Sequence, residues 1–324
     1  MHRTSTCLFA AIVLAGALIL PARAQEAPKI SRVGFLAPQG RSLPLFESFK
    51  EGLADLGYVE GRNLVIESRF AEGQLDRLPE LVAELVRLKL DVIAVTGAVT
   101  ARAAKKTVTD IPVVFAVVVD PVADNVVSSL ERPEGNLTGV TSFDPHQARK
   151  QLELLKEALP GLRRIAILGD QGVSEALIKA SEVQARDLGL QPQRLRVAGP
   201  SPNLAGAFAT LRKERADALL VLEEPVLGVV APAIAEMAAR DRLPTMLPPS
   251  RAAAGGLIAY GTSQVEAIHR MTAYVDKILK GAKPVELPVE RITRYELTVN
   301  LKTAQKIGIT IPSNVLNRAD RVVR

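Results

Sequence analysis

The sequence predicts an α/β protein made of two lobes, each a doubly wound parallel sheet with helices on both faces. Short apolar runs rich in β-branched residues alternate with amphipathic helical patterns, which is typical of open parallel sheets. This alternation runs to residue 143 and begins again at residue 163. A chain of 324 residues with 48% hydrophobic residues is also large enough for two domains with separate cores.

The first lobe begins with a buried strand and continues as a regular alternation. Its strands are expected at 32–38, 63–70, 91–97, 111–120 and 135–143. Its helices are expected at 44–58, 76–90, 100–108 and roughly 123–131. In the first of these helices apolar residues recur three or four positions apart, and Gly57 supplies the left-handed residue that commonly ends a helix.

The second lobe repeats the architecture without a close sequence repeat. Its strands are expected at 163–170, 191–199, 217–225, 243–250 and 255–261, and its helices at 174–190, 204–216 and 229–242. The remainder holds an amphipathic helix at 263–281 and a strand followed by a helix at 294–309. That tail is too short for a third domain, so it is expected to complete the two lobes, which makes the chain cross between them several times.

The N-terminus has the pattern of a secretory signal peptide over residues 1–24. A short basic stretch precedes an apolar run of 14 residues, and Ala22 and Ala24 form an A-x-A cleavage site. The run is too short to span a bilayer comfortably, which disfavours the alternative of a membrane anchor. Cys7, the one cysteine, lies ahead of most of the run, where a lipoprotein would not have it. The mature chain is therefore expected to lack disulfides, cysteine–metal sites and thiol nucleophiles.

Composition and motifs exclude several function classes. The absence of Trp, an aromatic content of 4% and scattered basic residues argue against a nucleic-acid surface. The chain has no G-x-G-x-x-G after its first strand, no Walker A sequence and no G-x-S-x-G elbow. His146 and His269 have no metal-ligating partner at useful spacing. We therefore predict no catalytic residues, no metal and no cofactor.

Polar and small residues recur where the predicted strands end. In open α/β sheets, ligands bind beyond the carboxyl ends of the strands, so these positions are the candidate ligand-binding residues. They are Gln39, Thr96, Gly97, Ala98, Asp120, Thr141, Ser142, Asp170, Glu224, Tyr260 and Thr262.

Several of these residues have a structural alternative. The segment 96–100, with the sequence TGAVT, leads directly into a helix, where N–H groups and hydroxyls suit an anion; equally, Thr100 could cap the helix. Asp120 precedes Pro121, so it could be the N-cap of the next helix, contact a ligand, or do both. Asp170 and Glu224 could each receive an ammonium or hydroxyl group, or cap a helix.

Motifs along nearly the whole mature chain resemble one bacterial family. The segments RVGFLAP, FKEGLADLGYVEGRNLVIESRFAEGQLDRLPELVAELV, IPVVFAVVVDPV, RPEGNLTGVT, ERADALLVL, YVDKILKGAKPVELPVE and YELTVNLKTAQKIGITIP are similar, in this order, to ABC-transporter substrate-binding proteins of the TrpX-like group. Any one of these motifs is weak, and the set together is specific.

The resemblance implies a type I periplasmic-binding-protein fold, in which two lobes joined by a multi-stranded hinge close on a small polar solute. It implies an N-terminal lobe of 25–141 plus about 261–288, and a C-terminal lobe of 142–260 plus about 289–324. It also implies a periplasmic protein, monomeric by default, that delivers an amino acid or related molecule to an ABC permease. A sensory module for a membrane receptor and a periplasmic enzyme on the same fold are the alternatives.

Three positions facing the ligand depart from the family pattern. Relatives often have Asn-Pro where this chain has Gly169-Asp170, and one acid before proline where it has Glu223-Glu224-Pro225. They often have an Asp soon after Tyr-Gly, where this chain has Thr262-Ser263-Gln264. Because of these differences, the resemblance alone does not predict that this chain binds the aromatic amino acids that known members bind.

Overall fold

The structure is a computed structural model. It describes residues 30–40, 44–142, 144, 146–171, 173, 175–199, 201–223 and 225–324. The predicted signal peptide at residues 1–24 lies outside the described residues.

The first sheet has six strands in the order β11-β5-β4-β3-β1-β2, and every neighbouring pair is parallel. Its strands are β1 (Ser31–Ala37), β2 (Leu64–Phe70), β3 (Val92–Thr96), β4 (Val113–Val118), β5 (Leu137–Thr141) and β11 (Glu290–Arg291). Near-continuous apolar runs such as that of β4 suit strands buried on both faces.

Helices cover both faces of this sheet, as predicted. Helices α1 (Pro44–Asp55) and α8 (Gln264–Leu279) pack on one face, and α2 (Leu78–Val86) and α3 (Ala98–Thr107) on the other. The alternation along β1 explains the division, because Val33 and Phe35 face the first pair of helices and Leu36 faces the second. Phe35 lies at the centre of an aromatic cluster, with its ring centroid 4.9 Å from that of Phe49.

The second sheet has seven strands in the order β13-β12-β10-β9-β8-β6-β7. They are β6 (Arg164–Gly169), β7 (Gln191–Arg196), β8 (Ala218–Val221), β9 (Thr245–Leu247), β10 (Ile258–Thr262), β12 (Tyr295–Asn300) and β13 (Arg321–Val323). Only β12 runs antiparallel to its neighbour β10 among the described pairs. The C-terminal ends of β6, β8, β9 and β10 therefore meet at one edge of the sheet.

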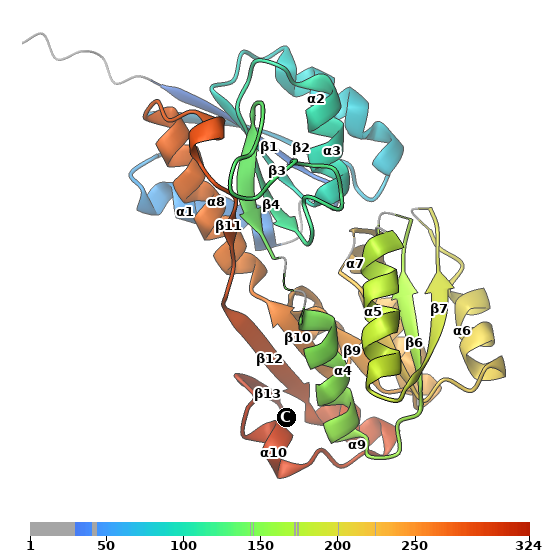
Figure 1. Cartoon of the computed structure of the whole chain (residues 1–324). Coiled ribbons are helices and arrows are strands. Elements are labelled where there is room, and N and C mark those ends of the chain that lie inside the picture. Colours follow the sequence, from blue (N-terminus) through green and yellow to red (C-terminus); the bar gives the residue numbers. More distant parts are fainter. Residues whose placement is uncertain are drawn as a thin grey trace, which may run out of the picture.

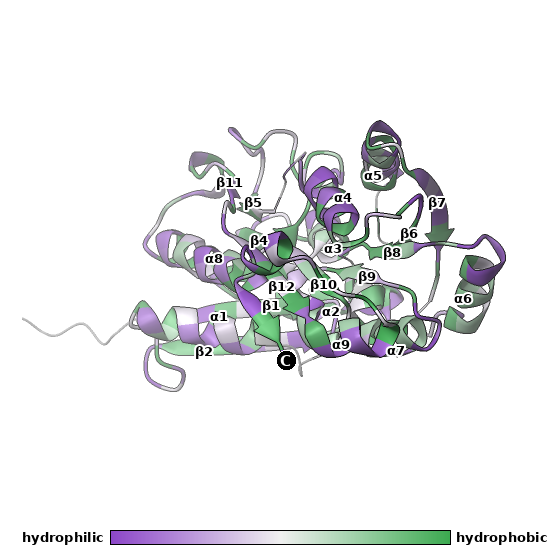
Figure 2. Cartoon of the chain, turned by 90° about the horizontal axis from the view of Figure 1, so that it is seen from below, coloured by the Kyte–Doolittle hydropathy of each residue, from purple (hydrophilic) through white to green (hydrophobic). Residues whose placement is uncertain are grey.

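Among the described residues, six α-helices cover the second sheet. Helices α4 (Gln147–Ala158), α5 (Glu175–Asp187), α9 (Leu301–Ile307) and α10 (Ser313–Leu316) share one apolar cluster, and α6 (Leu204–Lys213) and α7 (Pro225–Arg240) share the cluster on the opposite face. In Figure 2 the strands are mainly hydrophobic while the outer faces of the helices and the edge strand β7 are hydrophilic. A charged edge strand resists pairing with another molecule. Among the described residues, no helix is both long and apolar enough to cross a membrane.

The chain passes between the two sheets three times within the described residues. It leaves the first sheet after β5, returns between β10 and α8, and leaves again between β11 and β12. Helix α8 consequently lies beside α1 in the first lobe, although it directly follows a strand of the second (Figure 1). The prediction of two α/β lobes with a multi-stranded connection is confirmed.

One predicted local assignment is wrong, and one helix was not predicted. Residues 123–131, expected to be a helix, form a run of turns and bends after β4. Helix α4 has no counterpart among the predicted elements, although Leu152, Leu155 and Ala158 give it a buried stripe at helical spacing.

A β-bulge distorts the end of β4 where it faces the second lobe. The pairing with β5 shifts between Phe115, which pairs with Gly139, and Val118, which pairs with Thr141. Val117, inside the bulge, has φ of 58°, a conformation that costs a β-branched side chain energy. Gly139 is required opposite it, because a Cβ there would stand 2.1 Å from the carbonyl oxygen of Phe115. The bulge redirects β4 next to the interlobe cleft.

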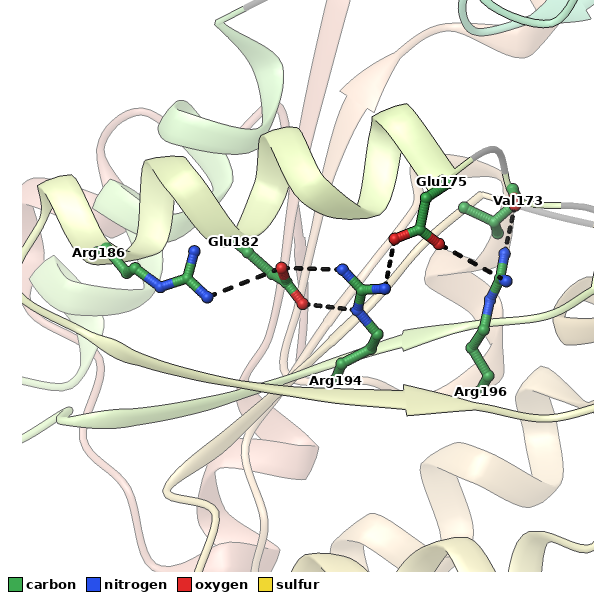
Figure 3. Close-up of polar contacts among 6 residues, drawn as sticks. All are labelled: Val173, Glu175, Glu182, Arg186, Arg194 and Arg196. Carbon is green, nitrogen blue, oxygen red and sulfur yellow. Dashed lines mark hydrogen bonds and ion pairs between the residues drawn. The ribbon is translucent and has the colours of Figure 1, made fainter.

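Ion pairs fix helix α5 to the edge strand β7 (Figure 3). Arg194 binds Glu182 through two contacts, Nε to Oε1 at 2.7 Å and Nη2 to Oε2 at 3.0 Å, and it also pairs with Glu175. Arg196 donates to the carbonyl oxygen of Val173 and lies 3.9 Å from Glu175. Two-pronged guanidinium–carboxylate pairs hold a defined geometry, so the rotation of α5 about its axis is restricted.

Candidate functional site

The carboxyl ends of strands from both sheets meet at a small polar cavity of about 20 Å³, here called the polar cavity. Its lining residues from the first lobe and the adjacent crossing are Gln39, Leu45, Thr96, Gly97, Ala98, Val117, Val119, Asp124 and Gln264. The second lobe contributes Glu223, which follows β8. The cavity therefore has walls from both lobes.

The N-terminus of α3 forms one side of the polar cavity. Its N-cap is Gly97, with φ of 82° and no side-chain cap, so the alternative in which Thr100 caps this helix is wrong. Thr96 and Thr100 are almost fully buried, and neither hydroxyl has a hydrogen-bond partner in the described part of the chain. The side-chain oxygen Oε1 of Gln39 likewise has no hydrogen-bond partner among the described residues. Buried polar atoms usually have partners, so this group of them indicates a place for a ligand.

Glu223 provides a carboxylate on the opposite side. Oγ of Ser250 donates a hydrogen bond of 2.9 Å to its Oε1, and the Gln264 amide lies beside it. Burial raises the pKa of Glu223, and the nearby Arg251 guanidinium opposes that rise. An arriving cation would favour the ionised carboxylate.

Two aspartates after β4 have different surroundings. Oδ1 of Asp120 accepts hydrogen bonds from the backbone N–H groups of Val122 (3.2 Å) and Ala123 (3.0 Å), so it caps a turn. The expected helix is missing, yet the capping contact is present. Asp124 is buried, which raises its pKa to about 6, while Arg102 at 3.3 Å opposes the rise.

A second small cavity, also of about 20 Å³, lies where two of the crossings meet. Ser142, Gln147, Thr262, Gln264 and Glu223 line it. Oε1 of Gln147 is buried there without a partner among the residues that the structure describes. This cavity therefore adds an unpaired acceptor beside the same glutamate.

A larger cavity of about 240 Å³ opens between α4 and α5. Asp120, Gln147 and Glu223 lie among its lining residues. Much of the remaining wall is apolar, with Leu222 as a buried example. The small cavities and the larger one therefore share Glu223.

The structure brings most of the predicted site residues to these cavities. Gln39, Thr96, Gly97 and Ala98 line the polar cavity, Ser142 and Thr262 line the cavity at the crossings, and Asp120 lines the larger one. Glu224 lies outside the described residues.

Three predicted residues have structural contacts away from these cavities. Oγ1 of Thr141 donates to the carbonyl oxygen of Val118 at 2.8 Å and so ties β5 to β4. Asp170 is fully buried and accepts a hydrogen bond from the backbone N–H of Leu227 at the start of α7. The Tyr260 ring stacks on Tyr295, with centroids 5.8 Å apart.

Several lining residues were not among the predicted site residues, and the polar ones include Asp124, Gln147, Glu223 and Gln264. Glu223 precedes Glu224 at a predicted strand end, and the alternation of side chains along β8 was the available signal for choosing between them. Gln147 could have been found from the apolar periodicity of α4. Among the described residues, no group of three or more His, Cys, Asp or Glu side chains could hold a metal ion.

Two α/β lobes, three crossings and a polar cleft between strand ends define a two-lobed solute-binding protein. Residues 41–323 match the family described as ABC transporter substrate binding protein, and the chain belongs to that family. The resemblance to its TrpX-like group is confirmed. Substrate-binding proteins of this family bind a small molecule outside the cytoplasm and work with an ABC permease, and they are not enzymes.

Individual relatives span most of the chain. A tyrosine-binding protein of Clostridioides difficile is 22% identical over 266 residues, which is 81% of this chain and 76% of the relative. A Streptococcus pneumoniae ABC domain solved in complex with L-Trp is 26% identical, covers 91% of this chain and 100% of its own, and superposes with a TM-score of 0.84. A conserved domain protein of Vibrio cholerae is 25% identical, with the same coverage and the same TM-score.

Proposed function

We propose that this protein captures an α-amino acid in its zwitterionic form between the two lobes and delivers it to an ABC permease. The observation that carries the proposal is one cavity with unpaired buried polar groups at a helix N-terminus on one side and a partly buried carboxylate on the other. A zwitterion supplies the anion and the cation that these two sides would each accept. The tyrosine-binding relative and the L-Trp complex support the same class of ligand.

The ligand carboxylate belongs at the start of α3. The first backbone N–H groups of a helix lack intrahelical partners and carry partial positive charge, which favours an anion. Gly97, the N-cap, has no side chain to compete for them. The Thr96 hydroxyl, unpaired within the described chain, would donate to the same carboxylate.

The ligand ammonium belongs at Glu223. This carboxylate accepts from Ser250, which leaves lone pairs free for a charge-assisted hydrogen bond to the ligand. A cation there would offset the burial that raises the pKa of Glu223.

Binding would couple to closure of the lobes because the two ligand groups contact opposite lobes. Thr96 lies in the first lobe and Glu223 in the second, so only a closed arrangement lets one solute reach both. A ligand that binds the closed state more tightly shifts the population toward it. The permease would then recognise the closed form.

Export and assembly complete the proposal. The pattern of residues 1–24 supports a cleaved signal peptide and a periplasmic location. We assign the lobes as residues 25–141 with about 261–288, and 142–260 with about 289–324, and the protein acts as a monomer. The short pairing of Glu290 with Val140 extends the first sheet slightly past this boundary.

The test is a binding series that removes one charged group at a time. Calorimetric titration is run with the twenty standard amino acids, and the best ligand is then compared with its amine and its des-amino acid. We expect each analogue to bind at least tenfold more weakly than the amino acid, since each leaves one side of the cavity unpaired. Binding of the des-amino acid as tightly as the amino acid would remove the role of Glu223 and contradict the proposal.

A further inference from the structure

We propose that Glu72 and Arg251 form an ion pair across the cleft when the lobes close, and that this pair raises ligand affinity from outside the solute cavities. Glu72 follows β2 in the first lobe, and Arg251 belongs to the second, in the 3-10 helix η2 (Pro249–Ala254). Both residues line an outer cavity of about 370 Å³. Neither is among the described residues that line the polar cavity, the cavity at the crossings or the cavity between α4 and α5.

Arg251 is a buried cation without a hydrogen-bond partner for its Nε. The residue is 8% exposed, and no described residue accepts a hydrogen bond from Nε or forms an ion pair with the guanidinium. Buried charges are normally paired, because removing an ion from water costs much free energy. A carboxylate that reaches the outer cavity would supply the missing partner.

Glu72 presents such a carboxylate from the first lobe. The residue is exposed and has no ion pair with another described residue. Its backbone is fixed on both sides, because the N–H groups of Ala71 and Gly73 donate to the carbonyl oxygens of Ala37 (3.0 Å) and Pro38 (2.8 Å). Its φ of 53° is uncommon for a residue with a side chain. The loop therefore holds the start of this side chain in one place at the rim of the cleft.

Each of the two charged groups lies over a glycine that lines the same cavity. A Cβ added to Gly40 would stand 2.3 Å from Oε2 of Glu72, and a Cβ added to Gly228 of α7 would stand 2.1 Å from Nη2 of Arg251. Both glycines line the outer cavity. A larger residue at either position would displace the charged group. The carboxylate and the guanidinium therefore reach the outer cavity from opposite lobes, each along a wall that carries no side chain.

The two lobes already approach each other at this cavity. A Cβ added to Gly73, the neighbour of Glu72, would stand 3.9 Å from Cγ2 of Val229 on α7, which is an ordinary van der Waals distance. Val229 also lines the outer cavity. Because the cavity has walls from both lobes, closure narrows it and brings the carboxylate of Glu72 toward the guanidinium of Arg251. A charge-assisted hydrogen bond can then form between them.

Ligand binding would strengthen the ion pair. Glu223 is the carboxylate of the second lobe that Arg251 influences electrostatically, and the proposed ligand ammonium would bind it. An ammonium at Glu223 leaves Arg251 with less compensating charge, and Glu72 becomes the carboxylate that can restore it. Closure also removes water from around the pair, which strengthens the attraction between its charges. The effect on affinity rests on the proposed function, whereas the pairing of the two residues does not.

The test is a double-mutant cycle on affinity, measured by calorimetric titration with whichever of the twenty standard amino acids binds most tightly. Glu72→Gln should weaken binding by about three- to tenfold, because it leaves Arg251 unpaired in the closed state. The loss should shrink at about 0.5 M NaCl, where charges are screened. Arg251→Gln alone would also act on Glu223, so the cycle isolates the pair: in that background Glu72→Gln should have no effect. Glu80→Gln, exposed on α2 of the same lobe, is the matched control and should leave affinity unchanged.

Equal affinities of the unaltered protein and Glu72→Gln would overturn the ion pair and leave the proposed function standing. An undiminished effect of Glu72→Gln in the Arg251→Gln background would overturn it too, since the effect would not need Arg251. Binding of no amino acid by the unaltered protein would overturn the proposed function alone. Small-angle X-ray scattering of the ligand-free protein then decides on the pair. Glu72→Arg places one guanidinium opposite another, so it should open the lobes and increase the radius of gyration, and an unchanged radius would overturn the pair as well.

Discussion

Oγ of Ser250 donates a hydrogen bond of 2.9 Å to Oε1 of Glu223, so the carboxylate of the second lobe is oriented from within its own lobe. Its other neighbour, Gln264, begins helix α8 in the first lobe. Glu223 thus lies at the contact between the lobes and in the walls of both small cavities and of the larger cavity between α4 and α5. This position makes Glu223 the sharpest test of the proposed site.

Glu223→Gln should lower ligand affinity at least tenfold without destabilising the fold. The change keeps shape and hydrogen-bonding capacity but removes the charge that would bind the ligand ammonium, a contact worth roughly 1.5–3 kcal/mol. Titration calorimetry gives the affinity, and urea denaturation gives the free energy of unfolding. Glu236→Gln, exposed on α7 with 71% of its side chain accessible, is the control and should change neither. Equal affinities for the two variants would contradict the role of Glu223.

Thr96→Val should raise stability and weaken binding. The Thr96 side chain is 1% exposed, and its hydroxyl is unpaired within the described residues, so its burial costs free energy that valine would not incur. We expect the free energy of unfolding to rise by about 1 kcal/mol, because valine has the same shape and suits a strand. Affinity should fall several-fold, since the ligand carboxylate loses a donor.

The control for Thr96 is Thr272→Val on helix α8. Thr272 is equally buried, but its hydroxyl donates to the carbonyl oxygen of His269 at 2.7 Å. Loss of this hydrogen bond should lower the free energy of unfolding by about 1 kcal/mol and leave ligand affinity unchanged. Thermal and urea denaturation with and without ligand separate the two cases. A Thr96 variant that lost stability and kept affinity would show that the hydroxyl is structural.

The strand ends of the fold were predictable because they depend on local features of the sequence, namely the spacing of apolar residues and the residue types that end each run. The buried runs that became β1, β3 and β4 are bounded by residues that cannot continue a strand, so Thr96, Gly97 and Asp120 could be named from sequence alone. The same logic placed Gln39 and Thr262 at the cleft. Which polar end residue faces the cleft depends on packing between lobes, and this is why Glu224 was chosen over its neighbour Glu223.

Three further features depended on contacts that sequence patterns do not carry. The chain after Asp120 was expected to be helical, but it forms turns, in which the Asp120 carboxylate satisfies two N–H groups locally. The bulge in β4 arises from pairing with β5, and neither strand alone signals it. Asp170 was a reasonable cleft candidate until the fold placed α7 against it.

Gly139→Ala should destabilise the protein by about 3 kcal/mol or more. A Cβ at this position would stand 2.1 Å from the carbonyl oxygen and 2.7 Å from the nitrogen of Phe115, and backbone atoms cannot yield as a flexible side chain can. Gly161→Ala is the control, because nothing lies within 4 Å of its added Cβ. That variant should be neutral or gain about 0.5 kcal/mol from reduced unfolded-state freedom. Urea denaturation measures both, and similar effects would contradict the close approach of β4 and β5.

Asp124→Asn should remove a specific pH dependence of stability. Burial raises the pKa of Asp124 from 3.8 in the unfolded chain to about 6 in the folded protein. Well below pH 3.8 the carboxyl is protonated in both states. Its contribution to the free energy of unfolding, measured relative to high pH, is therefore fully present there. Between pH 4 and 6 the unfolded chain loses the proton first, and stability falls as pH rises through the folded pKa. The shift of about two units corresponds to a loss of up to about 3 kcal/mol by pH 7.

The measurement is the free energy of unfolding of both proteins in urea at pH 4, 5, 6 and 7. Other titrating groups act equally on both, so the difference between the two proteins isolates Asp124. Relative to Asp124→Asn, the unaltered protein should lose stability steadily from pH 4 to about pH 6.5. Arg102→Gln removes the guanidinium 3.3 Å away that favours the ionised carboxylate, so it should extend that loss to higher pH. A difference that is flat across this range would mean that Asp124 is hydrated in the folded protein, and that the polar cavity is open to water on its side.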